Sequence, residues 1–197
     1  MKELLVATRN KKKLAEIKEL LADLPLIIIS LDDYPDMPEI EEDGDSFAAN
    51  ALKKAATIAL YTGKLTMGED SGLEVAALGQ APGIYSARYS GPDATDEKNN
   101  RKLLKELKKV PLAKRQARYQ CYVALVDGKK IIDIVSGRCR GVITRGAKGK
   151  NGFGYDPLFL IPRYNKTFGE LPSTVKARIS HRARALKKFR KVIQKYL

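Results

Sequence analysis

The first thirty residues alternate between short apolar runs and a helical repeat. Residues 3–7 and 26–30 form the apolar runs, and each predicts a strand, the second one buried on both faces. The helical repeat between them has Asn10 as its N-cap and is carried by Leu14, Ile17 and Leu21. This strand–helix–strand order predicts an α/β fold with a partly parallel sheet.

The next forty residues are divided by a loop and a glycine. The acidic stretch 32–45 predicts a loop, and residues 46–61 predict a helix that ends near Gly63. Residues 64–69 predict a third strand, which we expect to break at Asp70, because Asp-Ser-Gly is typical of a turn.

A different pattern occupies the second half of the chain. Asp96 has the position of an N-cap for a strongly basic helix. After it come three β-rich runs, 118–126, 131–136 and 138–144, and the first two are joined by the hairpin signal Asp127-Gly128. These runs predict an antiparallel meander inside an α/β chain.

Composition restricts the classes of protein that fit. The chain has 197 residues and no apolar stretch of the roughly 18–20 residues that a membrane helix needs. Its N-terminal apolar run is also too short for a secretory signal, so we expect a cytoplasmic protein with no membrane partner. Cys121 and Cys139 lack CxxC spacing, which favours two buried apolar side chains over a zinc site.

Charge is distributed in blocks. The net charge is +14, with nine Lys or Arg in residues 98–118 and nine more in residues 176–195. Residues 31–52 instead hold eight Asp or Glu and no base. Basic runs suit a polyanionic ligand or a solvated helix face, but a protein that only coats nucleic acid would gain nothing from the acidic block. Carboxylates together with basic side chains fit a site that holds a metal ion next to a phosphate group.

One polar segment, Thr8-Arg9-Asn10-Lys11-Lys12-Lys13, lies between the first strand and the first helix. A helix N-terminus placed there offers backbone N–H groups and a partial positive charge to an anion. The segment therefore predicts a phosphate-binding loop, with an ordinary helix cap as the alternative.

Two pairs of acidic residues have the chemistry of a divalent-cation site. Glu41 and Glu42 lie in the acidic loop, and Glu69 and Asp70 end the third predicted strand. Mg²⁺ prefers a few carboxylate oxygens together with oxygens of a bound substrate. The alternatives are a solvated acidic loop and a simple turn at Asp70.

Two further segments suit a flat heterocyclic base. Phe153-Gly154-Tyr155-Asp156 combines a ring that can stack, a glycine that lets a base approach, and a carboxylate that can accept from base N–H groups. Ser180-His181-Arg182 follows Lys176 and begins the last predicted helix, where it would present donors to keto oxygens. A packed β-turn and a structural helix cap are the alternatives.

The order of these segments is far more specific than any one of them. The chain closely resembles the inosine triphosphate pyrophosphatase family, also called Ham1-like, from about residue 4 to about residue 190, in the segments TRNKKK, SFAANALKKA, EDSGLEVAALGQAPGIYSARYSG, FGYDPLF and KARISHRARAL. The resemblance implies a single α/β domain over residues 1–197, with an elongated mixed β-sheet flanked by helices and two lobes around a deep substrate cleft. It also implies a homodimer.

The resemblance further implies roles for particular residues. Asp70 would be the catalytic residue, and Asp70 with Glu41 or Glu42 would hold the metal. The implied substrate-binding residues are Thr8, Arg9, Asn10, Lys11, Lys12 and Lys13 for phosphate, Ser71, then Phe153, Gly154, Tyr155 and Asp156 around the base, and Lys176, His181 and Arg182 at its 6-keto oxygen. Arg9 and Glu69 depart from the family pattern, where a small residue and an Asp are common.

The implied reaction is the Mg²⁺-dependent hydrolysis of ITP, dITP or XTP to the monophosphate and pyrophosphate, which removes non-standard purine nucleotides. Two alternatives remain at this level: a Maf-type nucleotide pyrophosphatase, and a basic nucleic-acid-binding protein. The ordered motifs argue against the first, and the carboxylates against the second.

Overall fold

The structure is a computed structural model that describes residues 1–37 and 40–197. The chain divides into two compact units. Unit 1 consists of Met1–Asp70, Cys121–Gly137 and Arg182–Leu197, and unit 2 consists of Ser71–Gln120 and Arg138–His181. Each unit is described by itself below.

The strands form one mixed sheet in the order β2-β1-β3-β4-β5-β6-β7. Their bounds are β1 Lys2–Val6, β2 Leu26–Ser30, β3 Thr66–Val75, β4 Gln116–Asp127, β5 Lys130–Ile143, β6 Phe159–Ile161 and β7 Lys166–Thr167. β1 pairs in parallel with β2 and β3, whereas β6 pairs antiparallel with β5 and β7. The predicted α/β class, a mixed sheet flanked by helices, is confirmed.

The opening of unit 1 follows the hydrophobic pattern. β1 leads into helix α1 (Lys11–Leu21), and the Asn10 side chain caps this helix as predicted. β2 has the predicted bounds, but the prediction that it is buried on both faces is wrong, because Ile27 is 44% exposed. The reason is its place at the edge of the sheet, where an apolar strand has a neighbour on one side only.

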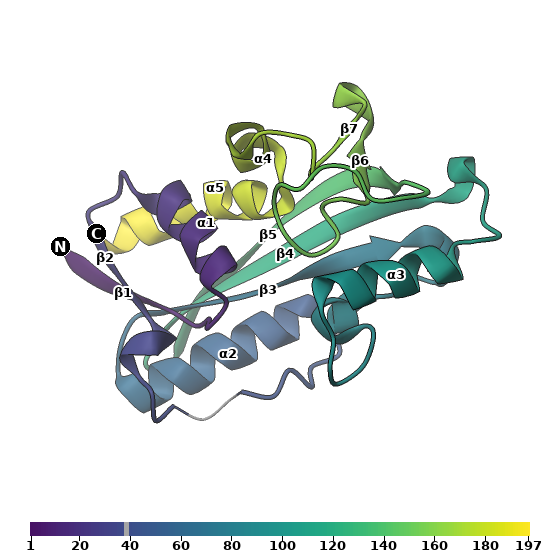
Figure 1. The fold of residues 1–197 in the computed structure, drawn as a ribbon. Coiled ribbons are helices and arrows are strands. Elements are labelled where there is room, and N and C mark those ends of the chain that lie inside the picture. The colour runs from purple at the N-terminus through teal and green to yellow at the C-terminus, as the bar shows by residue number, and fades with distance from the viewer. Residues whose placement is uncertain (38–39) are drawn as a thin grey trace. The chain divides into compact units, whose positions relative to one another are not determined.

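Helices cover both faces of the strands in unit 1. Leu4 and Val6 pack with residues of α1 and of α5 (His181–Ile193), while Leu5 packs with Ile58 of α2 (Phe47–Thr62). This alternation follows from the two-residue repeat of a strand. In Figure 1, α2 lies on one side of β1 and β3, and α1 and α5 lie on the other.

Helix α2 has clear start and stop signals. Ser46 is its N-cap, and Gly63 ends it with a left-handed φ of 66°. Its face toward the sheet is built from small residues, Ala51, Ala55 and Ala59, which pack with Ala124 and Val126 of β4. Small side chains allow the helix backbone to lie close to the strands.

Unit 2 has its own aromatic core. Helices α3 (Asp96–Glu106) and α4 (Ser173–Ile179) belong to this unit. Tyr119 of β4 packs against Phe159 and Phe168, with ring centroids 4.6 and 6.4 Å away.

Short 3₁₀ turns in both units complete the secondary structure at Leu31–Asp33, Ala76–Leu78, Gly83–Arg88, Leu112–Lys114, Pro162–Tyr164 and Gln194–Tyr196.

Three local predictions are wrong. β3 does not break at Asp70 but continues to Val75, and two of the β-rich runs join across Gly137 into the single strand β5. The N-cap of α3 is Thr95, whose hydroxyl accepts from Lys98, and Asp96 is the first helical residue. For the two strands, pairing with distant residues overrides the local turn preference. For α3, Thr95 supplies an equally local cap one residue earlier.

The described part of the acidic stretch, residues 32–37 and 40–45, agrees with the loop prediction apart from a 3₁₀ turn at its start. Pro38 and Glu39 of this stretch lie outside the described residues. Within the described residues, every helix is too short or too polar to span a lipid bilayer.

The close approach of α2 to β3 at Gly68 gives a stability prediction. A Cβ added at Gly68 would lie 2.1 Å from the carbonyl oxygen of Ala51 and 3.0 Å from Cβ of Ala55. We expect Gly68→Ala to lower the free energy of unfolding by about 1–3 kcal/mol, measured by urea denaturation, because overpacking forces the helix from the strand. Gly146→Ala is the control, since a Cβ there meets nothing within 4 Å. Equal stability of both variants would contradict the prediction.

Candidate active site

The segment after β1 is ordered by its own side chains. Oδ1 of Asn10 accepts from the backbone N–H groups of Lys12 and Lys13, at 3.0 and 3.1 Å, and the Thr8 hydroxyl accepts from the N–H of Asn10 at 3.1 Å. Arg9 donates to the carbonyl of Met37. The helix-cap alternative therefore describes Asn10 correctly, and phosphate binding by this loop stays a proposal.

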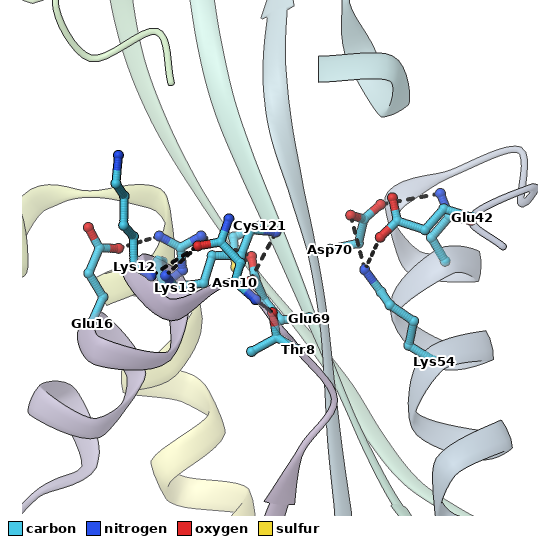
Figure 2. A network of polar contacts seen from close by, with 12 residues as sticks. Thr8, Asn10, Lys12, Lys13, Glu16, Glu42, Lys54, Glu69, Asp70 and Cys121 are labelled. Atoms are coloured by element: carbon cyan, nitrogen blue, oxygen red, sulfur yellow. Dashed lines mark hydrogen bonds and ion pairs between the residues drawn. The ribbon is translucent and has the colours of Figure 1, made fainter. Parts of the chain in front are cut away.

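Asp70 lies just beyond the end of β1. The register pairs Val6 of β1 with Met67 of β3, so β1 has ended where Glu69 and Asp70 stand on β3. Neighbouring side chains on a strand leave on opposite faces. Asp70 accordingly faces α2, while Glu69 contacts Lys13 of α1 (Figure 2).

On the α2 side, two carboxylates share one ammonium group. Nζ of Lys54 is 2.6 Å from Oε1 of Glu42 and 3.4 Å from Oδ1 of Asp70. Asn50, one turn before Lys54, donates to Oδ2 of Asp70 at 3.3 Å and accepts from the N–H of Gly44 at 2.8 Å. Figure 2 shows the carboxylates of Glu42 and Asp70 turned toward Lys54.

This arrangement distinguishes Glu42 from Glu41. Glu42 reaches the ammonium group that also binds Asp70, whereas Glu41 is exposed. Glu42 itself is half-buried. Of the two predicted metal carboxylates in the acidic loop, the structure thus brings only Glu42 to Asp70.

Burial and charge shift the acid–base chemistry of this group. Burial raises the pKa of Asp70 and outweighs the opposing effect of the Lys54 charge, with Glu42 adding to the rise. Burial alone would lower the pKa of Lys54, but the charges of Asp70 and Glu42 outweigh it and raise that pKa. Both shifts agree with a buried group in which carboxylates outnumber ammonium.

On the opposite face of β3, Glu69 is enclosed by cations. It lies 3.4 Å from Nζ of Lys13 and 3.3 Å from an Nη of Arg182, and its side chain is 1% exposed. The Sγ of Cys121 donates to it at 3.4 Å. Glu69 therefore neutralises cations in this structure, on the face away from Asp70.

Arg182 links two elements of unit 1. Its guanidinium donates to Glu16 of α1 and to Glu69 of β3, and the residue is buried. Burial alone would lower the pKa of Arg182, but the charges of Glu69 and Glu16 raise it above its usual range. Glu16 carried no prediction from the sequence.

The predicted base-binding residues of unit 2 also come together. Oδ2 of Asp156 accepts from the backbone N–H of Phe153 at 2.9 Å and from Nζ of Lys176 at 2.7 Å. The same Nζ is 4.5 Å from the centroid of the Phe153 ring. A ring, a carboxylate and an ammonium thus converge, although Lys176 is twenty residues from Asp156 in the sequence.

The other predicted residues of unit 2 include Tyr155, His181 and Ser71. Tyr155 is buried, and its hydroxyl donates to the carbonyl of Ser86 at 2.8 Å. The His181 ring stacks on Tyr119, with centroids 4.5 Å apart and planes 11° apart. Ser71 is half-buried and directly follows Asp70 in β3.

Comparison with known proteins agrees with these motifs. The model of the Ham1 family matches residues 4–192. The chain belongs to the Ham1 family. The resemblance seen in the ordered motifs is thereby confirmed, and the match decides against the Maf-type alternative.

Relatives of this Ham1-family chain match it nearly end to end. The dITP/XTP pyrophosphatases of Shouchella clausii and Geobacter sulfurreducens are 49% and 51% identical, covering 98% and 94% of this chain and the same shares of their own. The HAM1 protein from Coxiella burnetii has a TM-score of 0.91 at 40% identity, covering 99% of this chain and 100% of its own. The Ham1 protein from Staphylococcus aureus has a TM-score of 0.89 at 34% identity, with both chains fully covered (100%).

Two polar residues of this Ham1-family site carried no prediction. Asn50 and Lys54 lie within the segment SFAANALKKA, four residues apart on α2 and therefore on one side of the helix. Both are buried, on a helix whose other buried residues are mainly apolar. The available signal was this spacing, with polar side chains aligned with the apolar stripe of Ala51, Ala55 and Ile58.

The residues present fit a hard divalent cation. In the described part of the chain, no group of three or more His, Cys, Asp or Glu is arranged to hold a metal ion. Glu42 and Asp70 nevertheless present carboxylate oxygens to one position, which the Lys54 ammonium already approaches. Mg²⁺ commonly takes only one or two protein carboxylates and completes its shell with substrate phosphate and water.

The shared ammonium predicts a specific change in Asp70. We expect Lys54→Met to raise the pKa of Asp70 further, because the variant removes the cation that opposes burial and the Glu42 charge. NMR titration of labelled aspartate carboxyl carbons, with Asp70→Asn for assignment, measures the shift. Lys53→Met is the matched control, since Lys53 pairs with the exposed Asp43. An unchanged or lower pKa in Lys54→Met would show that Lys54 does not stabilise the Asp70 anion.

Proposed function

We propose that this Ham1-family chain is a nucleoside-triphosphate pyrophosphatase that hydrolyses dITP, XTP and ITP to the monophosphate and pyrophosphate. The observation that carries the proposal is the group in which buried Lys54 bridges half-buried Glu42 and buried Asp70, next to the strand that ends at the Thr8–Lys13 segment. Near-full-length relatives named dITP/XTP pyrophosphatase support the substrate class.

The proposed chemistry uses Asp70 as the base. Its carboxylate orients a water and accepts a proton from it as the water attacks the α-phosphorus, and pyrophosphate leaves. Mg²⁺, held by Glu42, Asp70 and triphosphate oxygens, would offset the charge that develops on those oxygens. Lys54 and Lys13 would help to neutralise the departing pyrophosphate.

The donor and acceptor pattern of unit 2 fits a purine with a 6-keto group. Phe153 supplies a stacking face, Asp156 accepts from ring N–H groups, and Lys176 donates. His181 belongs to the same proposed set, whereas Arg182, which the family resemblance adds to it, belongs to unit 1, where its guanidinium binds Glu16 and Glu69. A buried donor facing the 6-position would be left unpaired by the 6-amino group of adenine, which disfavours ATP.

The polarity of the donors at the 6-position does not distinguish GTP from XTP or ITP. GTP also carries a 6-keto oxygen, so its exclusion would require a wall against the 2-amino group. The homodimer implied by the family resemblance stays a prediction as well, and sedimentation analysis of the purified chain tests it.

The first activity prediction concerns the product. With Mg²⁺, the purified chain should release pyrophosphate from XTP and dITP, and turn over dATP far more slowly. Pyrophosphate and orthophosphate are assayed separately, and Asp70→Asn, prepared in parallel, should lose on the order of 100-fold in kcat because a general base is removed. Orthophosphate as first product, or equal turnover of dATP, would contradict the proposed function.

The neighbouring glutamates give a matched pair for the metal site. Glu42→Gln should raise the Mg²⁺ concentration needed for half-maximal activity by about tenfold or more, because a charged ligand becomes a neutral one. Glu41→Gln removes the same charge from the adjacent, exposed position and should leave the Mg²⁺ titration within about twofold. Similar shifts in both variants would mean that general charge, and not coordination, sets the Mg²⁺ requirement.

A further inference from the structure

Side chains of helix α3 form hydrogen bonds with both peptide groups of Gly154, which lies inside the proposed base-binding segment. Oδ2 of Asp96 accepts from the N–H of Gly154 at 2.8 Å, and Nδ2 of Asn100 donates to its carbonyl at 2.9 Å. Asp96 and Asn100 are four residues apart and so lie on one side of the helix. Both polar groups of one glycine are thereby bound to a single helix more than fifty residues away in the sequence.

These two bonds fix a backbone conformation that is otherwise loosely defined. Gly154 has a φ of 62°, in the left-handed region that glycine enters freely, and a Cβ there would meet nothing within 4 Å. Packing therefore does little to restrict it. Its N–H belongs to the peptide shared with Phe153, and its carbonyl belongs to the peptide shared with Tyr155. Binding both peptides sets the direction in which the Phe153 ring leaves the chain.

The same helix holds the neighbouring 3₁₀ segment, η3 (Gly83–Arg88). Nδ2 of Asn99 donates to the carbonyls of Ser86 and Ala87 at 3.4 and 3.0 Å, and its Oδ1 accepts from the N–H of Ser90 at 2.8 Å. The Ser86 carbonyl also accepts from the hydroxyl of Tyr155. Helix α3 thus reaches the 153–156 segment both directly, at Gly154, and through Ser86, at Tyr155.

Capping does not account for the Asp96 carboxylate. Thr95 caps α3 through its own hydroxyl, so the Asp96 contact with Gly154 is additional to the cap. At the other end of the segment, Asp156 holds the N–H of Phe153 and the ammonium of Lys176. Phe153 therefore lies between two anchored peptides, one bound by Asp156 and one by Asp96.

We propose that Asp96 and Asn100 are positioning residues for purine binding, which fix the Phe153 ring in its stacking orientation through the backbone of Gly154. The proposal rests on the proposed function, since it assigns Phe153 to the base. Losing either bond lets the segment sample further conformations, and the substrate must then order it on binding. The cost falls on binding of the base and leaves the phosphate chemistry at Asp70 unchanged.

The test uses Asp96→Ala and Asn100→Ala in the full-length protein, each with a matched control. Glu97→Ala removes the other acid of the first turn of α3, and so reproduces the loss of a favourable charge at the helix N-terminus. Arg101→Ala changes an exposed residue next to Asn100. Asp96→Asn retains an acceptor for the Gly154 N–H and serves as the conservative variant.

We expect KM for XTP to rise about three- to tenfold in Asp96→Ala and Asn100→Ala, with kcat within about twofold of the wild type. Asp96→Asn should recover part of the loss, and the controls should behave as the wild type. Two competitive inhibitors distinguish binding of the base from binding of the phosphates. In Asp96→Ala and Asn100→Ala, inosine monophosphate should bind more weakly by the same factor as KM rises, and the affinity for inorganic tripolyphosphate should not change. Equal weakening of both inhibitors, a fall in kcat at constant KM, or agreement with the controls would overturn the proposal.

A second measurement does not depend on turnover. Hydrogen exchange of peptides covering residues 150–157 should be faster in Asp96→Ala than in Glu97→Ala, because only the first loses the acceptor at Gly154. Unchanged exchange would overturn the positioning role. A wild type that binds inosine monophosphate but hydrolyses no triphosphate would contradict the proposed function alone, whereas a wild type that neither binds it nor hydrolyses a triphosphate would overturn both.

Discussion

The interaction on which the rest of unit 1 depends is the neutralisation of two adjacent buried carboxylates, Glu69 and Asp70. Removing an ionised carboxylate from water costs several kcal/mol unless a cation and hydrogen bonds replace the solvent. Because consecutive side chains of a strand face opposite ways, one cation cannot serve both. Glu69 is therefore paired with Lys13 and Arg182, and Asp70 is paired with Lys54. The helices on each face of β3 must consequently provide a positively charged side chain.

Unit 2 also contains a buried carboxylate neutralised by an ammonium group. Asp156 is buried and binds Lys176 at 2.7 Å, while also holding the backbone of its own segment. An ammonium kept in place by a carboxylate is already desolvated and oriented, so little reorganisation remains when a ligand arrives. Each unit thus carries a prepared donor, Lys54 beside the proposed catalytic residue and Lys176 beside the proposed stacking ring.

Periodicity and capping residues were enough to predict β1, α1, α2 and the class of the sheet, because those signals are local. The continuation of β3 through Asp70 was not predictable, since Asp-Ser-Gly has local turn chemistry and only pairing with neighbouring strands keeps it extended. Lys54 was missed for a related reason: a lysine on a helix is ordinarily solvated, and its burial becomes evident only when Glu42 and Asp70 are seen around it. Sequence order also left Glu41 and Glu42 equivalent, and tertiary contact separates them.

The charge blocks of the sequence acquire a physical meaning from this arrangement. The chain carries a net charge of +14, which favours any polyanion, nucleic acid included. At the Glu42–Asp70–Lys54 group, however, carboxylates exceed ammonium by two to one, and burial leaves the pKa of Asp70 raised. Under the proposed function, a bare polyphosphate would meet a local repulsion there, whereas a phosphate that arrives with a divalent cation would remove the excess negative charge and stabilise the Asp70 anion. The proposed function thus assigns the long-range attraction of polyanions and the local selection of metal-bound phosphate to different residues of the chain.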